Sequence, residues 1–242
     1  MSSKSTDTCG VAAGSTITLE WHEEDDRGSR GIEGEHWGPC LVYLAPLESN
    51  GEGSVWFKIF ELGYDTKTKD WCIDVFNRQQ GKLDIEIPSD IKQGAYLMRT
   101  EIIALHLAER VYGEDAKGGA EYYSNCAQLY IIGDGTAEPE GVAIPGVYDK
   151  NEPGIHFSLW DGFKSYPIPG PKLYTAGSLA NTNNDNMVLD YVDDSSEIEK
   201  PSVVEKAPKP SRVSSKSNCV QRRRLRRRRA MERKHLRIKD DL

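Results

Sequence analysis

The sequence lacks closely spaced cysteine pairs. None of its five cysteines forms a CxxC pair, which argues against a structural zinc ribbon and a thioredoxin-type redox site. The pairing of Cys40 with Cys72 is left open by the sequence. The cysteines, which fit one or two disulfides with a thiol left over, are Cys9, Cys40, Cys72, Cys126 and Cys219.

Long hydrophobic runs are also missing. No stretch approaches the roughly 18 apolar residues of a membrane span, so the composition excludes a membrane protein. The start, MSSKSTDTCG, has no charged segment followed by an apolar one, so the chain as printed shows no secretion signal. A disulfide would nevertheless imply an oxidising compartment, which conflicts with the missing signal.

Several motifs of hydrolases and calcium sites are absent. There is no GxSxG nucleophile elbow and no catalytic cysteine motif. The acids at 23–26 lack the spacing of an EF-hand loop, so we interpret them, with neighbouring His22, as a solvated loop.

Positive charge is scarce in most of the chain. The formal charge is −7, but residues 222–239 carry 11 Lys and Arg, which leaves a charge of about −15 on residues 1–221. A body this acidic does not attract nucleic acid. The Arg-rich tail is interpreted as a solvated tail, with a nuclear-localisation or polyanion-binding patch as the alternative.

Alternating apolar residues are present in several short blocks separated by turn signals. The predicted strands are 16–21, 40–44, 55–60, 83–87 and 129–132. Residues 101–110 fit neither period cleanly, and we favour a buried strand to about His106 over a helix. Many short strands with polar turns predict an all-β, immunoglobulin-like antiparallel sandwich with long loops.

The composition changes after the PIPGP segment at 167–171. We predict one sandwich domain over 1–175, because residues 176–219 are rich in Ser, Asn, Asp, Pro and Lys and are typical of a disordered linker. Residues 220–242 form the Arg-rich tail.

Four side chains with metal-binding chemistry lie far apart in the sequence: His36, His106, Glu121 and Tyr123. Only a folded sheet could bring them to one place. Imidazole suits copper, zinc, iron or nickel, so these residue types alone leave the metal open.

Eight motifs in a fixed order resemble the fungal lytic polysaccharide monooxygenases of auxiliary-activity family nine, formerly glycoside hydrolase family sixty-one. They cover roughly residues 5–175. The motifs are DTCG at 7–10, AGSTITLEW at 13–21, HWGPCLVYLA at 36–45, WFKI at 56–59, IPSDIKQGAYLMRTEIIALH at 87–106, GAEYYSNC at 119–126, EPGI at 152–155 and YPIPGPKLYT at 166–175.

The resemblance implies a secreted enzyme that cleaves cellulose or a related β-1,4-glucan oxidatively. It implies one copper ion, O2 or H2O2 as the oxidant, and an external electron donor. The runner-up function is a β-sandwich that binds polysaccharide without reacting. A third hypothesis, an intracellular protein directed to polyanions, rests on the tail alone.

The resemblance also implies roles for individual residues. His36 is similar to a copper-ligating histidine and Tyr123 to the axial tyrosine, with Tyr122 as a rival if the register slips. His106 is similar to a histidine near the oxygen site, where Glu121 also lies. Tyr166 is similar to an aromatic on the cellulose-facing surface. Cys9 and Cys126 fall at the positions of the family's disulfide.

The chain departs from the family pattern at two places. The family's first copper ligand, an N-terminal histidine, has no counterpart, so we expect an N-terminally truncated sequence with weak copper binding and impaired activity as printed. Glu121 stands where the family usually has glutamine. An ionised glutamate only accepts hydrogen bonds, and it can compete as a ligand.

Overall fold

The computed structural model describes residues 7–24, 26–111, 113 and 118–177. The predicted Arg-rich tail and all of the predicted linker except 176–177 lie outside these residues. No helix in the described part of the chain is long and apolar enough to cross a membrane.

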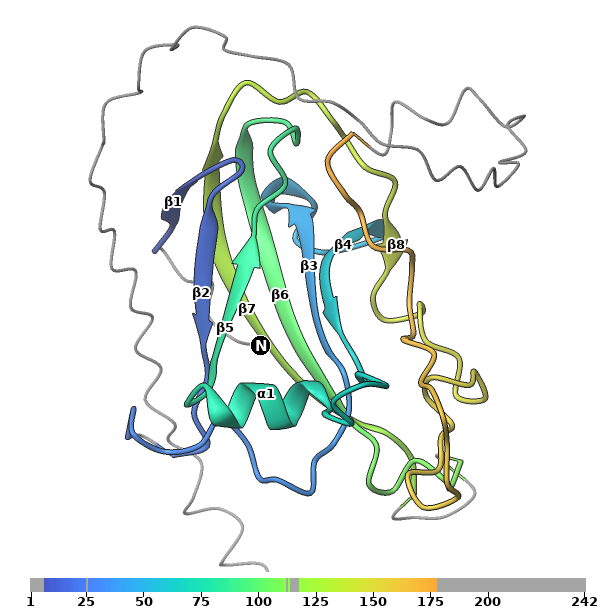
Figure 1. The fold of residues 1–242 in the computed structure, drawn as a ribbon. Coiled ribbons are helices and arrows are strands. Elements are labelled where there is room, and N and C mark those ends of the chain that lie inside the picture. Colours follow the sequence, from blue (N-terminus) through green and yellow to red (C-terminus); the bar gives the residue numbers. More distant parts are fainter. Residues whose placement is uncertain (1–6, 25, 112, 114–117, 178–242) are drawn as a thin grey trace, which may run out of the picture.

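The described chain is a β-sandwich with one short α-helix, which confirms the predicted fold class. A large sheet has the strand order β1-β7-β6-β3-β4-β8, and β2 and β5 form a second, two-stranded sheet (Figure 1). The elements are β1 (Cys9–Ala12), β2 (Thr16–Glu20), β3 (Cys40–Pro46), the 3₁₀ helix η1 (Leu47–Ser49), β4 (Ser54–Leu62), α1 (Cys72–Arg78), β5 (Lys82–Glu86), β6 (Gly94–Ala104), β7 (Glu121–Ile132) and β8 (Val142–Ala143).

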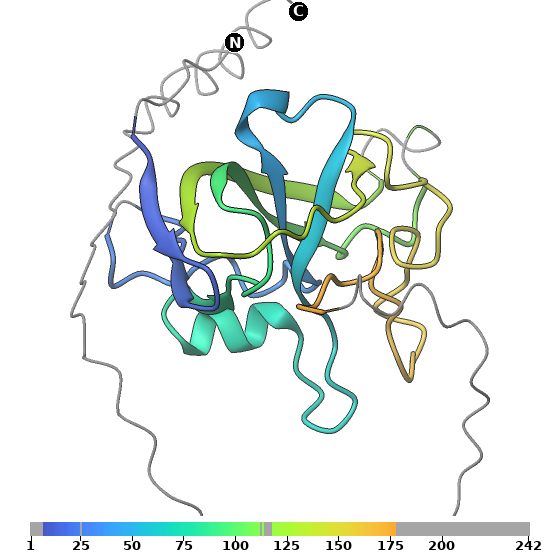
Figure 2. The same cartoon turned by 90° about the horizontal axis from the view of Figure 1, so that it is seen from above.

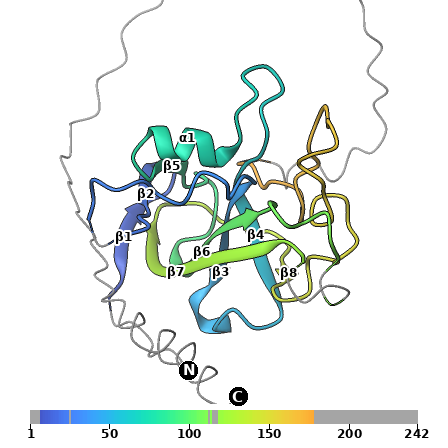
Figure 3. The same ribbon diagram turned by 90° about the horizontal axis from the view of Figure 1, so that it is seen from below.

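Both faces of the large sheet are covered. The β2–β5 pair and α1 lie over one face, and the segments after β8 lie beside the sheet at β4 (Figures 1 and 3). Strand β3 is buried along almost its whole length, so its residues alternate between two cores rather than between core and solvent. Val42 and Leu44 pack toward the β2–β5 pair, whereas Leu41 and Tyr43 pack on the opposite face.

All five predicted strand blocks lie in strands, with somewhat different ends. The ambiguous block is strand β6, which ends at Ala104. Four elements were not predicted: β1, β8, α1 and η1. Strand β1 pairs in parallel with β7, an exception to the predicted antiparallel pairing.

Helix α1 begins where a carboxylate satisfies a free backbone donor. The Trp71 N–H donates to Oδ2 of Asp74 at 2.8 Å, and at the last turn Arg78 pairs with Asp70. The helix is anchored to β3, because Cys72 forms a disulfide with Cys40 at a Cα–Cα distance of 5.8 Å. The structure thus decides the pairing that the sequence left open.

The disulfide implied between Cys9 and Cys126 is not made. Cys9 lies opposite Leu129 in the parallel β1–β7 pair, three residues beyond Cys126. Three strand residues span about 10 Å. The Cα atoms of a disulfide are seldom more than about 7 Å apart, so this register keeps the two cysteines out of reach.

His22 is another correction, because its side chain is only 11% exposed rather than solvated. Its Nδ1 lies 3.1 Å from the Ser29 carbonyl oxygen and its Nε2 lies 2.8 Å from Oε1 of Glu20. Arg27 contacts the same carboxylate. These partners hold the pKa of Glu20 at about 2, with Arg27 making the largest contribution and His22 the next.

Candidate metal centre

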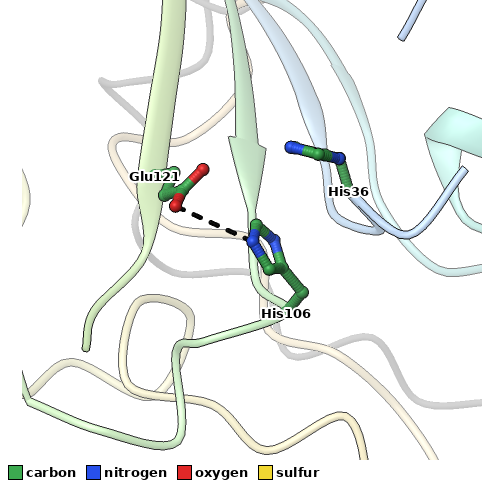
Figure 4. A group of neighbouring side chains, drawn as sticks. All are labelled: His36, His106 and Glu121. Carbon is green, nitrogen blue, oxygen red and sulfur yellow. Dashed lines mark ion pairs between the residues drawn. The ribbon is translucent and has the colours of Figure 1, made fainter. Parts of the chain in front are cut away.

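The centre lies at the end of the large sheet where β6 ends and β7 begins. Its four side chains come from three segments: His36 precedes β3, His106 follows β6, and Glu121 and Tyr123 open β7. Figure 4 shows His36, His106 and Glu121 converging from these segments. The structure therefore brings together all four residues that the sequence singled out.

A close backbone approach holds the His36 segment in place. Ile103 N–H donates to the Pro39 carbonyl at 3.1 Å, and Leu105 N–H donates to the Trp37 carbonyl at 2.9 Å. A Cβ atom on Gly38 would lie 1.8 Å from the Ile103 carbonyl oxygen, so only glycine fits there. The HWGP motif is thus explained by its packing against the end of β6.

Strand periodicity places Glu121 and Tyr123 on one face. Side chains two residues apart in a strand point the same way, and β6 pairs Ala104 with Glu121 and Ile102 with Tyr123. His106 lies just beyond the end of this ladder. Tyr122 points elsewhere and stacks on Tyr148, with ring centroids 5.6 Å apart, so Tyr123 is the tyrosine that faces the histidines.

Short polar contacts link the four side chains. Nε2 of His36 lies 3.1 Å from the Tyr123 hydroxyl, which donates to Oε2 of Glu121 at 2.7 Å. Nε2 of His106 lies 3.7 Å from Oε1 of Glu121. The two imidazole rings are 4.7 Å apart between centroids. One candidate ligand atom from each of His36, His106 and Glu121 lies within 4.8 Å of the other two.

The protons of this network can be assigned from its acceptors. The phenol of Tyr123 donates its hydrogen bond to the Glu121 carboxylate, so the hydrogen bond between the phenol and His36 needs a proton on Nε2 of the imidazole. Desolvation, followed by the hydrogen bond and charge of Glu121, raises the pKa of Tyr123 to about 12. Nδ1 of His36 and Nδ1 of His106 are buried without a hydrogen-bond partner among the described residues.

Tyr166 is not on the surface, contrary to the implied role in cellulose binding. Its side chain is buried and its hydroxyl donates to the Gly154 carbonyl at 2.6 Å. It belongs to an aromatic cluster on the face of the large sheet opposite the β2–β5 pair. We define the aromatic cluster as Tyr64, Trp71, Phe157, Phe163 and Tyr166, whose rings contact one another.

The most exposed aromatic of the described chain is Trp160, which the sequence did not single out. Its side chain is 63% exposed, and its ring lies edge-on to Trp37, the residue that follows His36, at 6.3 Å between centroids. Figure 2 shows the segments after β8 gathered on one side of the sandwich. Loop packing sets this exposure, so no local sequence signal could have identified Trp160.

The comparison with protein families agrees with this geometry. The sequence profile of Auxiliary Activity family 9 (formerly GH61) matches residues 1–166. The chain belongs to this family. Its similarity to individual members is moderate in sequence and clear in fold.

Two relatives are lytic polysaccharide monooxygenases of the same family. The chain is 41% identical over 177 residues to monooxygenase A of Aspergillus niger, a match that covers 72% of this chain and 41% of the relative. It is 38% identical over 184 residues to AA9-X282 of Trametes coccinea, covering 72% and 65%. The chain thus spans about half the length of the curated relatives it matches.

Solved structures of the family have the same fold. CvAA9A matches with a TM-score of 0.66 and 35% identity, over 69% of this chain and 76% of that chain. A cellulose-active polysaccharide monooxygenase from M. thermophila matches with a TM-score of 0.55 and 30% identity, over 70% and 75% of the two chains.

Proposed function

We propose that the protein cleaves cellulose or a related β-1,4-glucan oxidatively, as a copper-dependent lytic polysaccharide monooxygenase. The observation that carries this proposal is the convergence of His36 and Tyr123, which come from distant segments and lie 3.1 Å apart between Nε2 and the phenol oxygen. Membership of Auxiliary Activity family 9 supports the same chemistry.

The residues of the centre fit a copper ion. Two donors of one metal ion, each about 2 Å from it, lie roughly 3 Å apart when they are at right angles. The separation of Nε2 of His36 and the Tyr123 oxygen is 3.1 Å, and an ion bound at Nε2 would displace the proton that this nitrogen shares with Tyr123. Imidazole is a good copper ligand, so His36 would hold the ion and Tyr123 would lie beside it. Copper, when bound, supplies a redox-active centre that uses an external electron donor and O2 or H2O2.

The neighbouring residues position groups and hold protons. Glu121 accepts a hydrogen bond from the Tyr123 hydroxyl and fixes the phenol relative to His36. Nε2 of His106 lies 3.7 Å from the other Glu121 oxygen, so this pair can hold or deliver a proton next to the oxidant. We propose this proton-handling role for His106 and Glu121.

An exposed aromatic surface supports a polysaccharide substrate. Trp160 is 63% exposed, and its ring contacts Trp37 directly beside His36. Aromatic faces stack on sugar rings through their apolar area. We propose that Trp160 takes the substrate-binding role that the resemblance gave to Tyr166.

The proposal includes secretion. The Cys40–Cys72 disulfide is typical of proteins from oxidising compartments, and cellulose is an extracellular polymer. Of the partners expected from the resemblance, we retain the glucan, the oxidant and the electron donor as parts of this proposal.

The test is product analysis with the protein. We expect oxidised cello-oligosaccharides when the copper-loaded protein is incubated with cellulose and ascorbate, detected by mass spectrometry. His36→Ala should abolish these products, whereas His156→Ala, a change at an exposed histidine, should leave them unchanged.

Two outcomes would contradict the proposal. Folded, copper-loaded protein that binds cellulose without releasing oxidised products would favour the non-catalytic binding function. Equal product yields from wild type and His36→Ala would remove His36 from the copper site.

A further inference from the structure

The described residues supply a metal-ligand set that differs from the pair of His36 and Tyr123 in the proposed function. We propose that His36, His106 and Glu121 together bind one divalent metal ion, with the Glu121 carboxylate as a direct ligand. The inference deepens the proposed function, because it concerns the same centre and shares His36 with it. It gives Nε2 of His106 and Oε1 of Glu121 a ligand role in place of the proton-handling role proposed above, because ligands must be deprotonated to bind a metal.

Distances place the three donors close to a coordination geometry. Zinc binds imidazole nitrogens at about 2.0–2.1 Å and carboxylate oxygens at about 2.0–2.2 Å, so donors in a tetrahedral site lie roughly 3.3–3.5 Å apart. Nε2 of His106 and Oε1 of Glu121 are already 3.7 Å apart, and no pair in the set exceeds 4.8 Å. A small inward movement therefore completes the set.

The side chains have room for this movement. Glu121 is 41% exposed and His106 is 21% exposed, so neither is locked by core packing. Figure 4 shows the carboxylate and the two imidazoles converging on one another. The backbone segments that carry them are fixed by the β6–β7 ladder and by the hydrogen bonds of the His36 segment.

The unpartnered ring nitrogens are an independent observation. Nδ1 of His36 and Nδ1 of His106 are buried without a partner among the described residues. A buried polar atom without a partner is costly, and a bound ion is one of the few features that account for it. In His106 the nitrogen that faces Glu121 is Nε2, so a ring proton on Nδ1 leaves the lone pair of Nε2 available to a metal.

The carboxylate can serve the metal and Tyr123 at once. Tyr123 donates to Oε2 of Glu121, while Oε1 faces His106. Tyr123 is therefore a positioning residue for Glu121 in this set. A metal-bound carboxylate is commonly held by such a hydrogen bond.

The chemistry of the set favours borderline divalent ions. Two imidazoles and one carboxylate form the His2Glu set of catalytic zinc sites and the donor pattern of non-haem iron sites. Glutamine at position 121 would offer only a neutral amide oxygen. The negative charge of Glu121 therefore makes it the stronger metal ligand of the two. The resemblance predicted weak metal binding from His36 and Tyr123 alone, whereas this set adds a second imidazole and an anion.

The experiment measures zinc and cobalt binding to the full 242-residue chain by calorimetry and visible absorption. We expect tight one-to-one binding and the intense visible bands of tetrahedral Co²⁺. Glu121→Gln should weaken binding by more than the roughly 10- to 100-fold that removal of a hydrogen-bonding neighbour causes. The glutamine side-chain oxygen can still accept a hydrogen bond from the Tyr123 hydroxyl, so the change tests the charge of the ligand.

Controls separate this inference from the proposed function. Glu138→Gln, at an exposed carboxylate paired with Lys92, should bind metal like wild type. Unchanged affinity and spectrum in Glu121→Gln would overturn the inference, and loss of copper binding in His36→Ala alone would still support the proposed function. If Glu121→Gln abolishes zinc binding but the full-length protein yields no oxidised sugars, the inference stands and the proposed function fails. Circular dichroism checks that each variant is folded.

Discussion

The metal centre and the aromatic cluster flank the same large sheet, but they depend on different kinds of information. The centre is built from residues whose positions follow from local motifs and strand register, such as Gly38 in HWGP and the Glu121-Tyr123 pair. The aromatic cluster is built from rings on two segments, the loop between β4 and α1 and the segment after β8, which meet only after the chain has folded. The polar residues were therefore placed correctly by sequence, whereas the exposure of Tyr166 and Trp160 was not.

The largest expected effect is that of Gly38→Ala at the metal centre. The added Cβ would lie 1.8 Å from the Ile103 carbonyl oxygen, a backbone atom that cannot rotate away. We expect the free energy of unfolding to fall by about 3 kcal/mol or more, because the loop must separate from β6. Urea denaturation measures this change.

Gly34→Ala is the matched control, since nothing lies within 4 Å of the atom it would add. Equal stabilities of the two variants would show that the close approach at Gly38 does not hold His36 in place. A stable Gly38→Ala variant with unaltered metal affinity would also contradict our account of the motif.

An intermediate effect is expected in the aromatic cluster. Tyr166→Phe leaves the buried Gly154 carbonyl without its donor and should lower the free energy of unfolding by about 1–2 kcal/mol. Cellulose binding should not change, because the ring is buried. Thermal and urea unfolding together with a cellulose pull-down measure both quantities.

Trp160→Ala is expected to have the opposite effects to Tyr166→Phe, because it removes an exposed ring and not a buried hydroxyl. It should change stability by no more than about 0.5 kcal/mol, because the side chain is 63% exposed. Cellulose affinity should fall by an amount equivalent to about 1 kcal/mol. The reverse result, with Tyr166→Phe weakening binding and Trp160→Ala unfolding the protein, would restore the role that the resemblance gave to Tyr166.

The smallest effect concerns an ion pair near the surface. Arg27 and His22 lower the pKa of Glu20 in the folded chain to about 2, from an ordinary value of 4.5. A lowered carboxyl pKa stabilises the folded state above about pH 4.5, and this contribution is lost as the pH falls toward about 2. Arg27 is 68% exposed, so Glu20→Gln should cost about 1 kcal/mol or less at neutral pH.

Unfolding at several pH values checks this prediction. The stability difference between wild type and Glu20→Gln should disappear by about pH 2 and should shrink in high salt. A difference that stays constant across this range would mean that Glu20 acts through packing and not through its charge.

The sequence predicts the apolar strands of the sandwich better than it predicts helix α1 and the polar half of β7, for physical reasons. Strand β2 has one partly buried face, so the alternation of its apolar residues is visible, and β3 was found although both of its faces are buried. Helix α1 has only seven residues, too few for a helical period to show. The first half of β7, EYYSNC, has few apolar residues facing a core, so the strand was expected to begin eight residues later than it does.

The same reasoning applies to the site and the cysteines. The convergence of His36 and Tyr123 could be expected from the motifs that carry them. The contact between Tyr123 and Glu121 follows from their two-residue spacing once β7 is known to include both. The Cys9–Cys126 pairing failed because it depends on the register of β1 against β7, which no local pattern encodes.

The position of the centre at the end of the β6–β7 ladder affects how the molecule opens. The ladder runs from Gly94 opposite Ile131 to Ala104 opposite Glu121, and His106 lies just past its last pair. Ladders fray from their ends while their middles stay closed. Local opening of a few backbone pairs at this end would separate Glu121 from His106 while the rest of the sandwich stays folded. An ion bound to both side chains would therefore oppose this opening and slow amide hydrogen exchange where β6 ends and β7 begins.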